Sequence, residues 1–429
     1  MTPPRNLPPA LVSEVPGPRS RALAARLARV ESRNVTCLAP EPPIFWERAA
    51  GANVWDADGN RFVDLGAGFG VASAGHAHPR VVAALGAQGA TLLHAMGDVH
   101  PAAVKVELLE RLAALFPGGG PARAVLGSSG SDAVEAALET AALATGRAGV
   151  VAFEGAYHGL SLGALDATWR PEFRAPFAAR LPGATVFARF GDVSSVSRAT
   201  AGARPPVGAV LVEPIQGRGG ERIPPDGFLA GLRALCDREG WLLIADEVYT
   251  GLGRTGRTWA VDHEGVVPDL LCAGKGLAGG MPVSACLGRA AVMDAWPAST
   301  GESLHTQTFL GHPPGCAAAL AALAVLEEEK LAARAATLGA RVLAHLRARL
   351  APALAAGHVR AVRGRGLLLG IECDEGARAL RACAEALRRG VIVIPSGDAG
   401  EVVSVTPPLT IEEDLLLGAL DLLAEALAA

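Results

Sequence analysis

The chain has 429 residues, of which 50% are hydrophobic and 19% are charged, and its formal net charge is −4. A chain of this composition can bury a large core, which excludes global disorder. Its length predicts either two domains or a large domain with a smaller one. The small net charge leaves no electrostatic footprint for nucleic acid or an anionic membrane. We find no uncharged apolar stretch long enough to predict a membrane span.

Seven cysteines are scattered along the chain without a Cys-x-x-Cys pair. An odd, scattered set argues against a disulfide framework and against a zinc site, and it favours a reducing compartment. The N-terminus lacks the basic and apolar pattern of a signal peptide. We therefore expect a cytoplasmic protein without a bound metal.

The N-terminal residues 1–20 contain six prolines and predict an extended arm. A helix is expected over 20–33, and a hairpin over 52–64 turns at Asp58-Gly59. From about residue 80, helical stretches alternate with short apolar strands, whose near-continuous hydrophobicity is typical of a parallel sheet buried on both faces. These strands are expected at 122–126, 149–153, 207–212, 241–245 and 270–273.

This alternation predicts a large, doubly wound α/β domain over residues 66–325. A long helix follows Pro313, and beyond it the pattern changes to a helix, short strands and a final helix. We expect residues 326–429 to form a smaller α+β domain, and residues 1–65, with the N-terminal arm, to join it.

A serine- and glycine-rich cluster, Gly127-Ser-Ser-Gly-Ser-Asp132, follows the first of these strands and opens a helix. Free backbone amides and the helix dipole favour a phosphate group at such a position. The glycine allows close approach, and the serine hydroxyls add hydrogen-bond donors. Ordinary capping of the helix by serine is the alternative interpretation.

Tyrosine is scarce in this chain, which has only Tyr157 and Tyr249. Both follow apolar strands, where an aromatic ring can stack on a planar heterocycle. His158 lies beside Tyr157, and a purely structural histidine is its alternative interpretation.

An acidic residue, Asp246, ends the apolar strand over 241–245. A carboxylate is unfavourable in such a place unless it meets a positive partner. That partner is either an arginine such as Arg254, in a structural ion pair, or the protonated nitrogen of a pyridine ring.

Lysine is replaced by arginine almost everywhere in this chain, which keeps only Lys105, Lys275 and Lys330. The first and last of these lie in polar helical patterns, whereas Lys275 lies between glycines after an apolar strand. An amine can form a Schiff base and a guanidinium does not, so the pattern suggests that the amine of Lys275 is needed. A surface loop lysine is the alternative interpretation.

One cofactor requires these parts together, namely pyridoxal 5′-phosphate (PLP). It needs an amine for a Schiff base, an acid beside the ring nitrogen, stacking groups and a phosphate-binding site. Because ligands bind at the carboxyl ends of the strands in such a sheet, we expect these clusters to meet there.

In these clusters the sequence resembles the class III, or ω-, aminotransferases of the fold type I PLP enzymes, and the resemblance runs from about residue 40 to the C-terminus. The resemblance implies a mostly parallel seven-stranded sheet and transfer of an amino group between an amine, an ω-amine or an amino acid and a keto acid or aldehyde. Further matching segments are 55–59, 75–79, 213–217, 253–256, 308–313 and 362–367.

The resemblance also assigns roles by position. Lys275 corresponds to the Schiff-base lysine and general base, and Asp246 to the partner of the pyridine nitrogen. Tyr157 and Val248 correspond to the two sides of the ring. Thr308 corresponds to a threonine that reaches the phosphate of the other subunit, which implies a homodimer with shared sites. The remaining cofactor contacts that it implies are Ser129, Gly130, Ser131, His158, Glu213 and Tyr249.

Two positions depart from the family pattern. The arginine that commonly binds the substrate α-carboxylate is Ser404 here, and its usual glutamate partner is Arg218. Either Arg218 anchors a carboxylate from a new direction, or one half-reaction uses an amine without an α-carboxylate or an unusual acceptor; a solvated turn residue is the third interpretation of Arg218. Phe69 matches a position that lines the substrate pocket, with a core residue as its alternative.

Two other functions stay open from the sequence. An amino-acid racemase or epimerase of the same fold would use the same lysine. A non-catalytic binding protein would have little reason to keep Lys275 and Asp246 together.

Overall fold

A seven-stranded sheet forms the centre of the larger part of the molecule, and the computed structural model describes residues 6–38 and 41–428. The strand order is β4-β10-β9-β8-β7-β5-β6, and every strand runs in the same direction except β10, which is antiparallel to both its neighbours. These strands are β4 (Ala122–Gly127), β5 (Gly149–Phe153), β6 (Thr185–Ala188), β7 (Val207–Val212), β8 (Leu242–Asp246), β9 (Leu270–Ala273) and β10 (Ser284–Arg289). The mostly parallel seven-stranded α/β sheet expected above is thereby confirmed.

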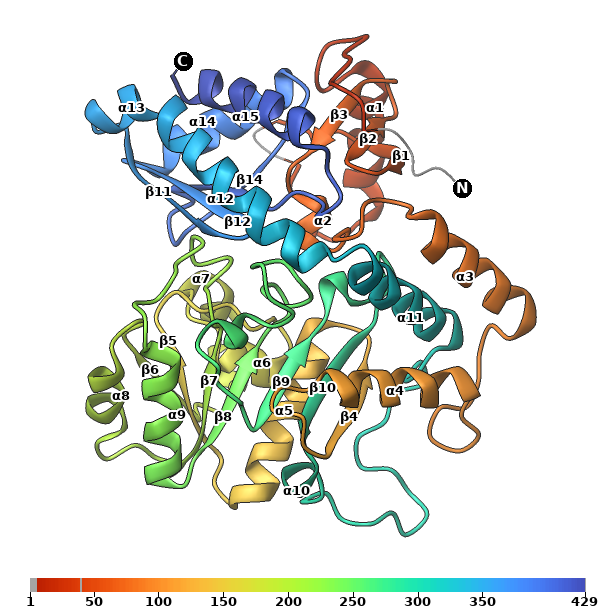
Figure 1. Cartoon of the computed structure of the whole chain (residues 1–429), viewed down its shortest axis with the longest axis vertical. Coiled ribbons are helices and arrows are strands. Elements are labelled where there is room, and N and C mark those ends of the chain that lie inside the picture. The colour runs from red at the N-terminus through yellow and green to blue at the C-terminus, as the bar shows by residue number, and fades with distance from the viewer. Residues whose placement is uncertain (1–5, 39–40, 429) are drawn as a thin grey trace.

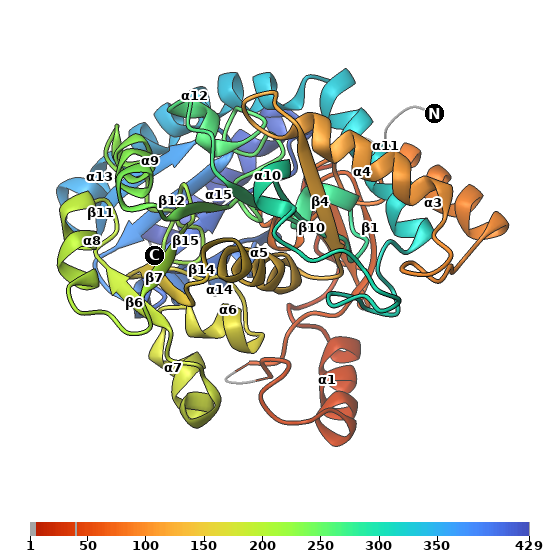
Figure 2. The ribbon, with the colours of Figure 1, turned by 90° about the horizontal axis from the view of Figure 1, so that it is seen from below.

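Helices cover both faces of this sheet, as Figure 2 shows from below. On one face, α4 (Ala103–Leu115), α8 (Val193–Thr200) and α9 (Phe228–Glu239) pack in a core with Val151 and Phe153 of β5. On the other face, α5 (Gly130–Thr145) packs with the alternate residues Val150 and Ala152. Successive strand residues point to opposite faces, so a sheet covered on both sides needs the continuous apolar runs seen in the sequence.

A smaller part of the molecule joins the two ends of the chain, with the red and blue segments side by side in Figure 1. The predicted hairpin forms between β2 (Asn53–Asp56) and β3 (Arg61–Asp64), with β1 (Trp46–Ala50) beside β2. Strand β13 (Val391–Ile392), from far along the chain, pairs in parallel with β3. The N-terminal arm lies along the same hairpin, where Ala10 forms a bridge with Arg61.

A third sheet, which is antiparallel, has the order β11-β12-β15-β14 and packs against its own helices. Its core includes α12 (Leu331–Arg349), α14 (Gly376–Arg388) and α15 (Glu413–Ala428). The strands are β11 (Val359–Arg365), β12 (Leu368–Cys373), β14 (Ile394–Ser396) and β15 (Val402–Val405). The remaining α-helices are α1 (Pro18–Val30), α2 (Ala67–Gly70), α3 (Pro79–Thr91), α6 (Leu162–Asp166), α7 (Pro171–Arg174), α10 (Ala290–Met293), α11 (Pro313–Glu328) and α13 (Ala351–Ala355).

The domain boundaries at 65/66 and 325/326 stay a prediction. The pairing of β3 with β13 supports the joining of the two chain ends, whereas α11 runs without interruption across the second boundary.

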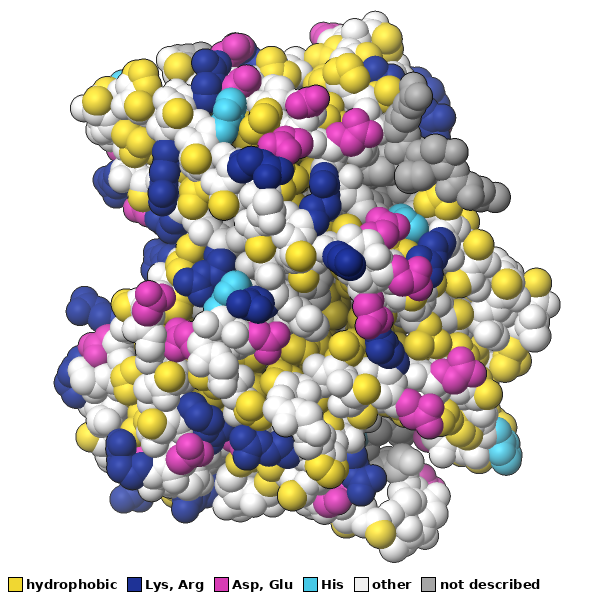
Figure 3. Space-filling view, viewed as in Figure 1, with side chains coloured by type: hydrophobic (Ala, Val, Ile, Leu, Met, Phe, Trp, Pro, Cys, Tyr) yellow, Lys and Arg dark blue, Asp and Glu magenta, His cyan; other side chains and the backbone are white. Residues whose placement is uncertain are grey.

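The outer surface carries mixed charges. On the face in Figure 3, the acidic and basic side chains of the described residues are interspersed. Within residues 6–38 and 41–428, no helix combines the length and the apolar character that crossing a membrane would require.

Candidate active site

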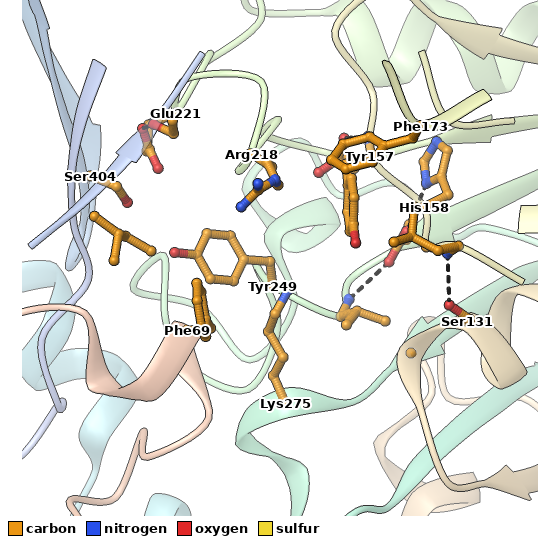
Figure 4. A pocket seen from close by; sticks show the side chains of 18 of the residues that line it. Phe69, Ser131, Tyr157, His158, Phe173, Arg218, Glu221, Tyr249, Lys275 and Ser404 are labelled. Atoms are coloured by element: carbon orange, nitrogen blue, oxygen red, sulfur yellow. Dashed lines mark hydrogen bonds and ion pairs between the residues drawn. The ribbon is translucent and has the colours of Figure 1, made fainter. Parts of the chain in front are cut away.

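A cavity of about 490 Å³ lies where the carboxyl ends of the parallel strands face β14 and β15 of the smaller part. This is the edge at which such sheets bind ligands. Most of the residues singled out from the sequence meet there (Figure 4). They are Phe69, Gly130, Ser131, Tyr157, His158, Glu213, Arg218, Asp246, Val248, Tyr249 and Lys275.

Lys275 follows β9 and begins a 3₁₀ turn over Lys275–Ala278. Its φ of 42° is left-handed, an unfavourable conformation for a residue with a side chain, and residues of this kind cluster at active sites. Its Nζ lies 4.2 Å from the centroid of the Tyr249 ring, and no hydrogen bond or ion pair engages it within the part of the chain that the structure describes. Burial lowers the pKa of Lys275, against the opposing carboxyl groups of Asp246 and Glu213, which favours a nucleophilic amine.

Asp246 ends β8, and its carboxylate is held from two sides. Its Oδ2 lies 2.7 Å from Nδ1 of His158, and its Oδ1 accepts a hydrogen bond of 3.1 Å from the amide of Val248. Both Asp246 and His158 are buried. The alternative of an ion pair with Arg254 is wrong.

Arg254 lies elsewhere in the same loop region, and its guanidinium donates to the carbonyl oxygens of Leu367 and Pro407. It therefore joins the larger part of the molecule to the smaller one.

Glu213 follows β7 and connects two loops of the cavity. It accepts hydrogen bonds from the amides of Tyr157 at 3.1 Å and Gly217 at 3.2 Å. Burial raises the pKa of Glu213 to about 7; His158 opposes this shift and Asp246 adds to it. Glu213 thus positions the loop of Tyr157 and the loop of Arg218.

The start of α5 offers the features of a phosphate site. The amides of Gly130 and Ser131 are at the first two helical positions, where no intrahelical acceptor exists. A Cβ at residue 130 would lie 2.9 Å from Cγ1 of Val248, so only glycine lets the helix approach Val248 this closely. Ser129 does not line the cavity, and its hydroxyl accepts from the amide of Asp132 in a capping box. Helix capping, the alternative interpretation, therefore describes the side chain of Ser129.

The residues present fit the predicted cofactor. The cavity has a buried acid at Asp246, an amine at Lys275 without a hydrogen bond, and open helical amides at Gly130 and Ser131. Tyr157 and Val248 line it as the resemblance implies. Tyr249 lies with its ring beside Lys275, but its hydroxyl is 3.2 Å from Oγ1 of Thr406, on the side of the cavity where Ser404 lies in Figure 4.

Arg218 lies in the cavity wall, as Figure 4 shows. Its guanidinium lies 5.6 Å from the ring centroid of Tyr157 and 5.9 Å from that of Phe173. The side chain is exposed, and among the described residues no carboxylate lies within 4 Å of it. Its backbone is held by the amide of Gly397, which donates to the Arg218 carbonyl at 3.0 Å.

Several lining residues were missed from the sequence. Phe173 lies on α7, and Glu221 ends the loop of Arg218. The signal for Glu221 was an acid directly after the glycine-rich stretch 217–220, which requires a tight chain path. The residues missed are Gly159, Leu160, Phe173, Glu221, Ile394, Pro395 and Ser396.

Thr308 is exposed and does not line the cavity of its own chain. Its segment packs against residues 94–98, because Thr306 donates to Asp98 at 2.8 Å and the rings of Phe309 and His94 lie 5.5 Å apart. Large exposed hydrophobic side chains gather on these two segments. They are Leu92, Leu93, Met96, Val99, Leu304 and Phe309.

Comparison with known proteins gives consistent matches. The family model described as aminotransferase class-III matches residues 37–427. The chain is 41% identical over 392 residues to an acetylornithine aminotransferase of Methanopyrus kandleri, covering 90% of this chain and 95% of that protein. It is 38% identical over 445 residues to a 4-aminobutyrate aminotransferase of Mycobacterium leprae, covering 97% of each.

A solved structure is also similar. An ornithine aminotransferase of Toxoplasma gondii, whose active site holds PLP at partial occupancy, matches with a TM-score of 0.86 and 33% identity, covering 95% of this chain and 94% of that one.

Proposed function

The chain belongs to the class III aminotransferases, and we propose that it uses Lys275 and Asp246 for catalysis and Arg218 to bind the carboxylate of a substrate. As a member of this family it has the type I fold and is a PLP-dependent enzyme that transfers amino groups. The three side chains enter one cavity from the end of β8 and from the loops after β9 and β7.

Different residues of the cavity would contact different parts of the cofactor. Gly130 and Ser131 would bind its phosphate, Tyr157 and Val248 would contact the ring, and Lys275 would attach to it. When bound, PLP supplies a carbonyl carbon that reacts with amines and a ring that withdraws electrons. Asp246 would hold the ring nitrogen, and His158 fixes the direction of the Asp246 carboxylate through Nδ1.

The amine of Lys275 carries the proton transfer. Its pKa is lowered by burial, so the amine can accept the proton from the substrate Cα and deliver it again during the transfer. A group that moves a proton both ways functions best with a pKa near the working pH.

The observation that supports the carboxylate site is the guanidinium of Arg218 at the cavity wall, which pairs with no carboxylate of residues 6–38 and 41–428. An arginine offers two parallel N–H donors to a carboxylate. The rings of Tyr157 and Phe173 lie 5.6 and 5.9 Å from the guanidinium, on the same side of it, and they leave its N–H groups to a ligand.

Arg218→Ala tests this role. We expect the KM for keto acids and for carboxylate-bearing donors to rise about tenfold or more, because a charge-assisted pair is lost. The KM for amines without a carboxylate should stay nearly unchanged. Arg222→Ala is the matched control, since Arg222 lies in the same loop but faces Asp398 at 3.6 Å. Equal KM changes for both donor types would contradict the anchor.

We also propose that the chain forms a homodimer. The exposed hydrophobic segments around residues 92–99 and 304–309 support an interface that would place Thr308 at the partner's site. The cytoplasm remains our expectation for its location, in line with six cysteines that form no disulfide: Cys236, Cys272, Cys286, Cys316, Cys373 and Cys383.

A further inference from the structure

We propose that Glu221, Ser396 and Ser404 form a subsite for a second amino group of the substrate, so that the enzyme accepts diamines or diamino acids. This inference rests on the proposed function, because the first amino group is the one transferred at Lys275. The subsite lies in the same cavity but at its other end, where Figure 4 shows Glu221 and Ser404 together, away from His158.

The three side chains are almost fully buried yet only partly hydrogen-bonded. Glu221 is 1% exposed, Ser404 1% and Ser396 5%. The hydroxyl of Ser396 donates to Oε2 of Glu221 at 2.6 Å. Among the described residues, no hydrogen bond reaches the other carboxyl oxygen, Oε1. A buried carboxyl oxygen is rarely left without a donor, so at this cavity wall Glu221 offers an acceptor to a ligand.

The backbone holds Glu221 in this place under strain. Its φ is 46°, in the left-handed region, which is unfavourable for glutamate. The amide of Glu221 donates to the carbonyl of Gly217 at 3.0 Å, and Nε of Arg363 donates to the carbonyl of Glu221 at 3.1 Å. Strain of this kind persists where the surrounding structure fixes a residue for a function.

No cation of the described chain neutralises this carboxyl group within 4 Å. The guanidinium of Arg363 instead pairs with Glu372 and with backbone carbonyls. Ser404 stands where the family commonly has an arginine, so this position brings no cation to the cavity. A substrate ammonium supplies both a positive charge and hydrogen-bond donors, whereas a carboxylate would meet the negative field of Glu221 and Glu213.

The cavity then carries two anchors of opposite charge. A transaminase binds its two substrates in turn in one pocket, so Arg218 would hold the carboxylate of the keto acid and Glu221 the distal ammonium of the amine donor. No ion pair within 4 Å joins Arg218 to Glu221 in the described chain, so both are available to ligands.

The test compares donors that differ only in the second amine. The PLP-loaded enzyme is assayed at pH 8 with a fixed keto acid, using α,ω-diamines of about three to six carbons against monoamines of the same length. A second series compares diamino acids with the matching amino acids. We expect kcat/KM to be about tenfold or more higher for the donor with the second amine, as for a hydrogen-bonded charge pair.

In Glu221→Gln, the ratio of kcat/KM for the donor with the second amine to kcat/KM for the matching donor without it should fall close to one. The value of kcat/KM for the monoamines should stay within about twofold of the wild-type value. Ser404→Ala should reduce the preference by a smaller factor. Asp398→Asn is the control, because it removes an exposed carboxylate two residues from Ser396 and should keep the wild-type preference.

A wild-type preference near one, or a preference that survives Glu221→Gln, overturns the subsite while the aminotransferase activity stands. If Glu221→Gln does not fold, the wild-type comparison and Ser404→Ala decide. Absence of turnover with every donor in both series would contradict the proposed function itself, and the subsite with it.

Discussion

Nδ1 of His158 lies 2.7 Å from Oδ2 of Asp246, and both residues are buried. Asp246 ends β8 and His158 lies in the loop after β5, with β7 between these two strands in the sheet. A buried pair of this kind is little screened by solvent, so it fixes the position of the carboxylate. The pair thereby defines the end of the cavity where a ring nitrogen would lie.

Replacing Asp246 by asparagine keeps the shape of this side chain and removes its charge. We expect kcat to fall by about a hundredfold or more, because the electrostatic stabilisation of the reacting state is lost, with a smaller change in KM. His158→Gln should lower kcat less, since His158 acts only by positioning Asp246. Steady-state kinetics of the two variants show which has the larger decrease in kcat. An Asp246→Asn variant with the wild-type kcat would contradict the catalytic role of Asp246.

The start of α5 gives a prediction about cofactor affinity. Gly130→Ala would place a Cβ 2.9 Å from Val248, so the helix must shift away from the ring position. We expect the Kd for PLP, measured by equilibrium dialysis, to rise about tenfold or more. Gly86→Ala is the control, because a Cβ at this position in α3 has open space around it. An unchanged Kd for Gly130→Ala would show that the phosphate is bound elsewhere.

Glu247 gives a prediction about pH and stability. It is buried, it accepts a hydrogen bond from the amide of Val261 at 2.9 Å, and burial raises its pKa to about 7. The folded protein therefore binds more protons than the unfolded chain between pH about 4.5 and about 7. The stabilising contribution of protonated Glu247 is complete at the lower end of this window and is lost at the upper end.

Urea unfolding of the apoprotein between pH 5 and 8 measures this effect. The free energy of unfolding of the wild type should decrease as the pH rises through this window. In Glu247→Gln this decrease should be smaller by up to about 1 kcal/mol per pH unit. Glu172→Gln, at an exposed position, should leave the slope unchanged. Glu213 and Glu221 have their pKa raised to about 7 as well, so some slope should remain in Glu247→Gln. Identical slopes for wild type and Glu247→Gln would contradict the assignment.

The proposed dimer depends on the exposed hydrophobic segments. Phe309 is 63% exposed in the single chain, and Phe309→Asp should shift the protein toward monomers in analytical ultracentrifugation and lower the activity with it. Leu380→Asp on α14 alters a side chain that is 52% exposed and should keep the assembly unchanged. Thr308→Ala should weaken PLP binding without dissociating the dimer. A monomeric wild type would contradict the shared site.

The sequence reveals those parts of the site that follow directly from strand ends. Asp246 and Lys275 were recognisable because each follows a continuous apolar run, and both strands form almost where expected. Strand β6 was missed because it lies at the edge of the sheet, where only Ala188 of its residues is buried and the apolar run is short. Strand β10 was missed because Ser284 and Gly288 interrupt its apolar pattern.

Glu221 could not be paired with Ser396 and Ser404 from the sequence. They lie about 180 residues apart, and only the folding of the smaller part against the sheet brings them into one cavity. The acid at 221 was visible, but its burial and its missing partner are properties of the tertiary structure.

The proposed mechanism requires that PLP attach to Lys275. Borohydride treatment of the PLP-loaded protein, followed by peptide mapping, tests it directly, and the two other lysines are internal controls. We predict a pyridoxyl group on the peptide that contains Lys275 and on neither of the peptides that contain Lys105 and Lys330. An unmodified Lys275, or a label on Lys105 or Lys330 in its place, would contradict the account.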